Sequence, residues 1–142
     1  MIKNTPLQIA SSFLVVALLG ADIYSCSCEF WSARKKLRKA KIVFVGEVLS
    51  TTCQKVSCQE NMITFKVEKY WKGVKESQVQ IYSAPPVCCT CGLQVGNGDK
   101  VLVFAFKGEG EKLETSLCSS TRVGTEIANK EMRELGNAKY LK

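Results

Sequence analysis

The 142-residue chain contains no histidine, and this absence excludes several kinds of catalytic site. Serine and cysteine hydrolases usually depend on an imidazole base, and zinc hydrolases usually depend on imidazole ligands. Zinc sites that mix cysteine with histidine are excluded for the same reason. We therefore predict that the protein is not an enzyme and has no cofactor of its own.

The chain also lacks an apolar run long enough to cross a bilayer as a helix. "IASSFLVVALLGA", residues 9–21, instead has the length of the apolar part of a signal peptide, and one positive charge, Lys3, precedes it. We predict a signal peptide over residues 1–25 and a secreted protein without a transmembrane span, whose N-terminus is Cys26. A cut nearby, for instance after Ala21, is the alternative.

Repeats, linkers and low-complexity segments are absent as well, so residues 26–142 suit a single domain. The loss of Lys3 and Asp22 with the leader leaves the net charge at +7. We expect the protein to be a monomer. We also expect that it does not bind nucleic acid, because the chain has few obvious surface aromatics on which bases could stack.

One segment, "ARKKLRKAK" at residues 33–41, holds a dense cluster of basic residues. Such a cluster can bind an anionic polymer of the extracellular matrix, with Lys35, Lys36 and Arg38 as the candidate residues. The alternative is a solvated helix face, because charge runs commonly serve solubility.

All eight cysteines follow residue 25. An even number of cysteines behind an export signal predicts an oxidising compartment and a disulfide framework. Metal binding is the competing interpretation, but "CSC" at 26–28 and "CCTC" at 88–91 do not supply the two Cys-x-x-Cys pairs of a zinc ribbon.

Alternating and β-branched apolar residues predict five strands and a mainly β protein. The first three strands form a meander, and "GEGE" joins the last two into a hairpin. Five short strands with small flanking helices point to a closed or partly open barrel of the oligonucleotide/oligosaccharide-binding type. The predicted strands cover residues 41–50, 62–71, 77–83, 101–107 and 112–117.

Two short helices flank these strands. Ser32 can cap a helix over residues 33–40, with its lysines on the wet side. Thr125 can cap a second helix that ends at Gly136, in which Ile127, Met132 and Leu135 lie near helical spacing.

The strand order brings distant cysteines to one rim. In an antiparallel meander, the loop after the first strand emerges at the same end as the loop after the third. The first loop holds Cys53 and Cys58, and the other holds Cys88, Cys89 and Cys91. We therefore expect these five sulfur atoms at one end of the barrel.

Several motifs, in order and spacing, resemble the inhibitory domain of the tissue inhibitors of metalloproteinases and the related single-domain, netrin-like secreted proteins. The resemblance covers nearly all of residues 26–121 and implies a five-stranded barrel with flanking helices. The motifs are "CSC", "KIVFVGEV", "VEKYWKG", "QIYSAP…CG", "GDKVLVFAF" and "LETSLCSST".

The resemblance also implies two disulfides, Cys26 to Cys91 and Cys28 to Cys118. The four remaining cysteines allow three pairings. We favour bridges between Cys53 or Cys58 and Cys88 or Cys89, since these residues share a rim. A Cys53–Cys58 bridge beside a vicinal Cys88–Cys89 bridge is the alternative, disfavoured by strain.

The function implied by the resemblance is inhibition of zinc metalloproteinases. In the family, the α-amine and carbonyl oxygen of the first residue chelate the zinc of the target enzyme, and the second side chain enters its specificity pocket. These residues would be Cys26 and Ser27, with Cys28 fastening the tip and Thr90 at a contact position. An α-amine with a pKa of about 7.7–8.0 is partly neutral at pH 7 and can bind zinc.

Two other functions compete with inhibition. A non-inhibitory netrin-like module could bind anionic matrix or another protein through the basic segment. The motif "IYSC" also loosely resembles a lipobox, which predicts a lipid-anchored or periplasmic bacterial protein acylated at Cys26.

Overall fold

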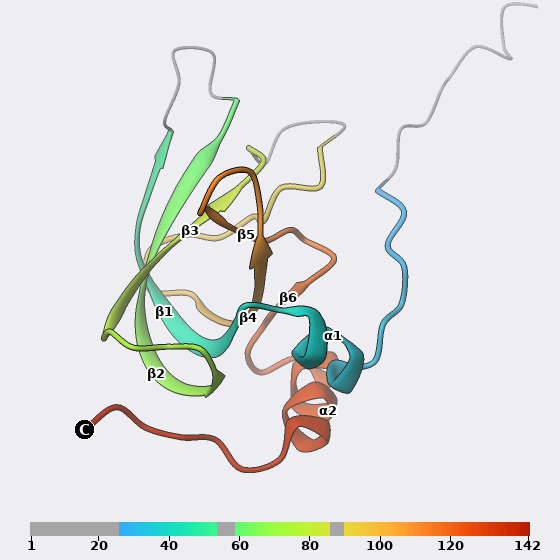
Figure 1. The fold of residues 1–142 in the computed structure, drawn as a ribbon. Coiled ribbons are helices and arrows are strands. Elements are labelled where there is room, and N and C mark those ends of the chain that lie inside the picture. The colour runs from blue at the N-terminus through green and yellow to red at the C-terminus, as the bar shows by residue number, and fades with distance from the viewer. Residues whose placement is uncertain (1–25, 54–58, 86–89) are drawn as a thin grey trace, which may run out of the picture.

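The computed structural model describes residues 26–53, 59–85 and 90–142, which form a closed barrel of five strands with two helices outside it (Figure 1). Strands β1, β2 and β3 form an antiparallel meander, and β4 and β5 form a hairpin. The sheet closes because β1 also pairs with β4, and β3 pairs with β5. The predicted mainly β barrel is thus confirmed. The strands are β1 (Ile42–Cys53), β2 (Asn61–Lys72), β3 (Gln78–Ser83), β4 (Lys100–Lys107) and β5 (Leu113–Glu114).

The fifth strand is shorter than predicted, and a further strand follows it. β5 ends at Glu114 because Thr115 and the serines after it form a turn in which hydroxyl groups bond to nearby backbone. After this turn, β6 (Ser120–Arg122) pairs with β4.

Residues 42–48 of β1 and 101–105 of β4 are mostly buried on both faces, which explains their nearly continuous apolar sequences. Phe44 and Val103 point into the barrel core, whereas Val43 and Phe104 pack in a second cluster beneath the helices. Strand β2 alternates buried and more exposed residues over most of its length, because its outer face is open to solvent.

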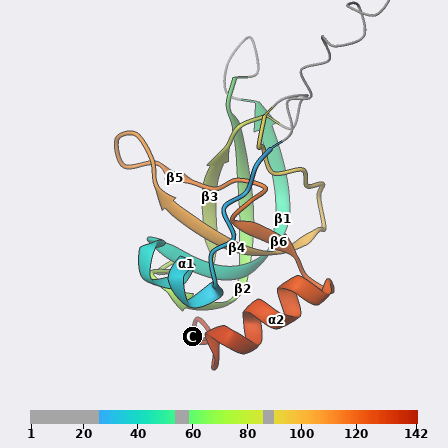
Figure 2. The ribbon, with the colours of Figure 1, turned by 90° about the vertical axis from the view of Figure 1, so that its right-hand side faces the viewer.

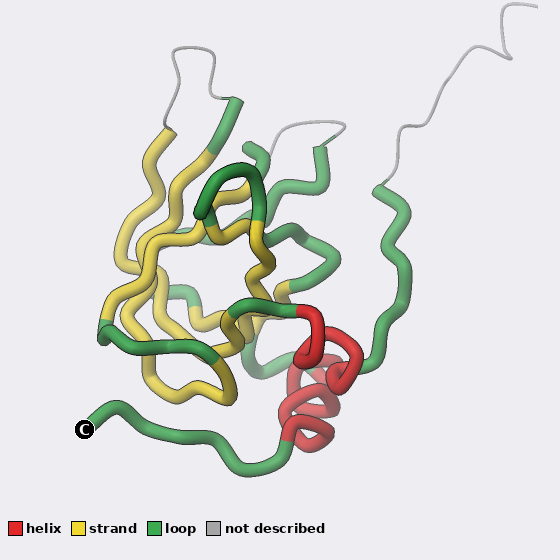
Figure 3. The backbone as a smooth tube through the Cα atoms, in the orientation of Figure 1, coloured by secondary structure: helices red, strands yellow, loops and turns green. Residues whose placement is uncertain are grey.

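Helices α1 (Ala33–Lys39) and α2 (Glu126–Leu135) lie side by side on one flank of the barrel (Figure 3). The predicted caps are confirmed: the side chain of Ser32 accepts a hydrogen bond from the Lys35 backbone, and that of Thr125 accepts one from Ala128. Gly136 ends α2 with a φ of 74°, a conformation that favours glycine.

Two side chains on these helices differ from expectation. Ile127 does not join Met132 and Leu135 against the core but is 65% exposed. Lys36, predicted on the wet side and as an anion-binding residue, is buried, and its Nζ lies 2.6 Å from Glu131 Oε1 on α2. Lys36 therefore drops out of the candidate anion-binding set.

The strands predicted to bring the cysteine loops to one rim end at a common edge, while Cys58, Cys88 and Cys89 lie outside the described residues. Cys53 lies opposite Asn61, and Asn61 lies opposite Ser83, so β1 and β3 end at the same edge of the barrel. Within the described ranges, neither helix has the length and apolar character needed to cross a membrane.

Candidate inhibitory tip

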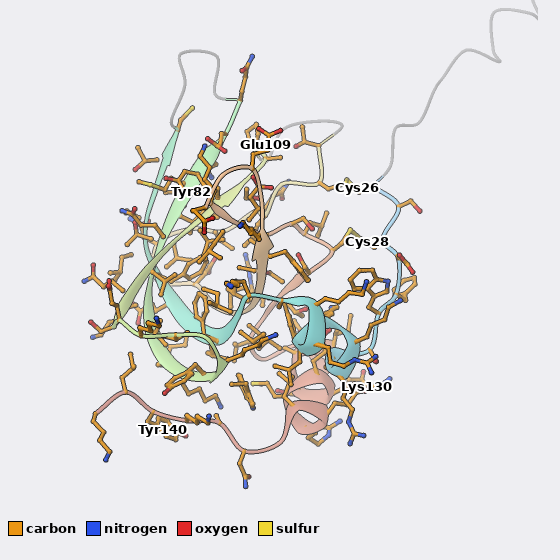
Figure 4. The ribbon with its side chains drawn as sticks, in the orientation of Figure 1. Cys26, Cys28, Tyr82, Glu109, Lys130 and Tyr140 are labelled. Carbon is orange, nitrogen blue, oxygen red and sulfur yellow. A yellow bond between two sulfur atoms is a disulfide. The ribbon has the colours of Figure 1, made fainter. Side chains whose placement is uncertain are left out.

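The segment before α1 runs along the outside of the barrel and is tied to it by two disulfides (Figures 2 and 4). Cys26 is bonded to Cys91 with a Cα–Cα distance of 5.6 Å, and Cys28 to Cys118 with a distance of 5.3 Å. Both predicted pairings are confirmed. The bridges span 65 and 90 residues, and each stabilises the fold by about 4 kcal/mol in the chain-entropy model.

The loop that carries Cys91 is held at several points. The carbonyl oxygen of Cys91 accepts a hydrogen bond of 2.9 Å from the backbone N–H of Leu117, which lies in the turn that carries Cys118. Leu93 N donates to the buried Ser83 hydroxyl at 2.8 Å. The two loops that anchor the tip are therefore also bonded to each other.

Gly92, which follows Cys91, has backbone packed where a side chain would be. A Cβ atom there would lie 2.1 Å from Ala84 O and 2.6 Å from Pro85 O. Real Cβ atoms do not approach backbone so closely, so any other residue must displace the loop and with it Cys91.

We expect Gly92→Ala to destabilise the protein by about 2–3 kcal/mol, since overpacking forces the backbone to shift. Denaturant unfolding measures this loss. Gly96→Ala is the matched control, because nothing lies within 4 Å of a Cβ at Gly96 and the change should be nearly neutral. Equal effects of the two changes would contradict the close packing at Gly92.

Hydroxyl groups stiffen the turn that carries Cys118. Thr115 Oγ1 donates to Phe104 O at 2.9 Å and lies 2.6 Å from Ser120 Oγ. Ser119 Oγ accepts from Ser116 N at 3.0 Å, and Cys118 N donates to Ser116 Oγ. This role was not predicted from the sequence, although the run "TSLCSST" contains its signal in hydroxyl residues on both sides of one cysteine.

Ser27 is exposed between two half-buried cysteines. It borders a cavity of about 280 Å³ between the N-terminal segment and the barrel, which Trp31, Phe106 and Ser119 also line. Thr90 is half-buried beside Cys91, and its hydroxyl donates a hydrogen bond to the Pro85 carbonyl. The structure thus brings Cys26, Cys28 and Thr90 to one region, with Ser27 open to solvent.

Glu29 links the segment electrostatically to α1. The Trp31 indole N–H, followed by the Lys35 ammonium 3.5 Å away, holds the pKa of the Glu29 carboxyl below its usual range. The indole N–H is buried and meets no acceptor at good hydrogen-bond geometry within the described residues, so we attribute its effect to a nearby dipole. Because this pKa is depressed, the attraction holds at neutral pH and is lost as the pH falls through the pKa of Glu29.

The other predicted site residues are only partly described. Cys53 is disulfide-bonded, whereas Cys58, Cys88 and Cys89 lie outside the described residues, as does the pairing predicted among them. Lys35 is half-buried and Arg38 is exposed. Among the described residues, no group of three or more acidic or cysteine side chains is placed to hold a metal ion.

The chain matches no protein-family model and no curated protein.

Proposed function

We propose that the protein is a secreted inhibitor of zinc metalloendopeptidases whose N-terminal Cys26 binds the catalytic zinc of its target. The free α-amine and the carbonyl oxygen of Cys26 form a five-membered chelate at the position that a catalytic zinc otherwise leaves to water. Ser27 faces the specificity pocket of the enzyme. The protein contributes ligands to zinc but no catalysis.

The observation that carries this proposal is the double anchoring of the tip. Two bridges within three residues fix the backbone on both sides of the exposed Ser27. A segment held in this way loses little conformational entropy when it docks, so more of the contact energy appears as affinity. The resemblance of the sequence motifs to those of the metalloproteinase inhibitors is the reason for proposing that the anchored tip binds zinc.

The lipoprotein alternative conflicts with the anchoring. Attachment of lipid to the Cys26 sulfur would prevent its bond to Cys91, and acylation of the amine would remove the chelating nitrogen. A matrix-binding module is the second candidate. The exposed Arg34, Arg38 and Lys39 of α1 favour it, although Lys36 no longer contributes.

Intact-mass measurement and N-terminal sequencing of the exported protein test the proposal. We expect Cys26 as the first residue, no lipid, and a mass consistent with all eight cysteines in disulfides. This protein should inhibit a zinc endopeptidase and leave a serine endopeptidase unaffected. An N-terminus other than Cys26 would end the inhibitor proposal and leave the matrix-binding module, whereas an acylated Cys26 would end it in favour of the lipoprotein alternative.

A further inference from the structure

A second surface lies beyond the tip, where the N-terminal segment, the Cys118 turn and α2 enclose an apolar groove of about 630 Å³. Three of its residues are large apolar side chains exposed to solvent: Phe30 at 99%, Ile127 at 65% and Leu117 at 51%. Together they make a patch of the kind that marks interaction sites. We call this surface the Phe30 groove.

The acidic side chains that line the Phe30 groove all have partners within the protein: Glu29 pairs with Lys35, Glu131 pairs with Lys36, and Glu134 accepts a hydrogen bond from the backbone N–H of Ala33. Lys130 also lines the groove, is exposed, and has no ion-pair partner among the described residues.

Further cations lie against Trp31, which also lines the Phe30 groove. Lys35 Nζ and Lys39 Nζ lie 4.4 and 5.0 Å from the centre of the Trp31 ring. This arrangement places an aromatic ring and two ammonium groups next to one another at the edge of a groove that also exposes large apolar side chains. Such a combination suits the boundary between water and the apolar interior of a bilayer.

We propose that the Phe30 groove docks the protein on an anionic lipid surface. Phe30, Leu117 and Ile127 enter the headgroup and acyl boundary, while Lys39 and Lys130 meet lipid phosphate or carboxylate groups. A second copy of this chain is a poorer occupant, because each molecule carries a net charge of +7. Phe30, Ile127 and Leu117 are exposed to different extents, and fluid lipid can adapt to such an uneven surface more easily than a folded protein can.

Vesicle binding tests this proposal with the disulfide-bonded protein, at low salt. The probes are vesicles of phosphatidylcholine alone and vesicles of equal parts phosphatidylcholine and phosphatidylserine. We expect binding to the anionic vesicles only, with a blue shift of Trp31 emission in a Trp71→Phe background. Phe30→Ser should weaken binding about tenfold, and Lys39→Gln about fivefold.

Tyr140→Ser is the matched control. Tyr140 is 68% exposed but lies well away from Cys28 and Lys130 (Figure 4), so its loss should leave vesicle binding unchanged. The exposure of Phe30 means that Phe30→Ser should keep the wild-type unfolding transition, so a weakened interaction cannot be attributed to misfolding.

Three results would overturn the proposal. One is no binding to anionic vesicles at low salt. Another is equal binding of wild type and Phe30→Ser, which would reduce the contact to charge alone, as expected for a sulfated polymer such as heparin. The third is equal loss in Phe30→Ser and Tyr140→Ser. Protease inhibition is measured in parallel, and its presence or absence does not decide this test.

Discussion

A protein with one alanine added before Cys26 is expected to inhibit zinc endopeptidases about a thousandfold more weakly than the protein that begins at Cys26, a loss of about 4 kcal/mol. The added residue converts the α-amine of Cys26 into an amide nitrogen, which has no lone pair available for zinc. It also places a new residue where the catalytic zinc would stand. Inhibition constants against a zinc endopeptidase measure the effect.

The fold should tolerate this extension. The bridge from Cys26 to Cys91 uses the side chain, which the added alanine leaves in place. Denaturant unfolding and the disulfide content should therefore match those of the parent protein. The control carries the alanine after Lys142 and should inhibit normally. Undiminished inhibition by the N-terminally extended protein would sink the chelation mechanism.

The second large effect is expected at the ion pair between α1 and α2. We expect Lys36→Met to destabilise the protein by about 3–5 kcal/mol, because it leaves a buried carboxylate uncompensated. Only about a tenth of each side chain is exposed in this pair, and Thr121 Oγ1 also donates a hydrogen bond to Glu131, at 3.1 Å. Thermal and denaturant unfolding measure the loss.

Lys100→Met is the matched control for that experiment. Lys100 and Glu68 are also 2.6 Å apart, but about half of the Lys100 side chain is exposed, so the loss should be much smaller. Replacing both Lys36 and Glu131 by methionine should recover most of the stability, since no charge is then left buried. A Lys36→Met protein as stable as Lys100→Met would show that burial does not set the cost.

Most of the barrel follows from local sequence, because alternation and β-branched residues determine which face of each strand is apolar. The strand Ser120–Arg122 was not predicted, because three residues with little apolar character are too few to show an alternation of apolar and polar side chains. The exposed Ile127 and the buried Lys36 were misjudged for a different reason. Helical spacing shows which residues share a face, but the partner facing Lys36 lies 95 positions away.

Parts of the candidate site could also be predicted from the sequence, and other parts could not. The bridges of Cys26 and Cys28 were predicted through a resemblance of ordered motifs, since spacing alone leaves many pairings open. The Phe30 groove could not be predicted, because it joins residues near 30, 117 and 127 that only the folded chain brings together.

The attachment of the tip couples the stability of the barrel to the activity proposed for the tip. Residues 26–30 belong to no helix or strand, and the barrel core contains none of them. The bonds to Cys91 and Cys118 hold these residues to the barrel and also stabilise the barrel itself. Thiol reduction would therefore release the tip and lower the free energy of unfolding at the same time, so a reducing environment would remove the proposed activity together with much of the stability of the fold.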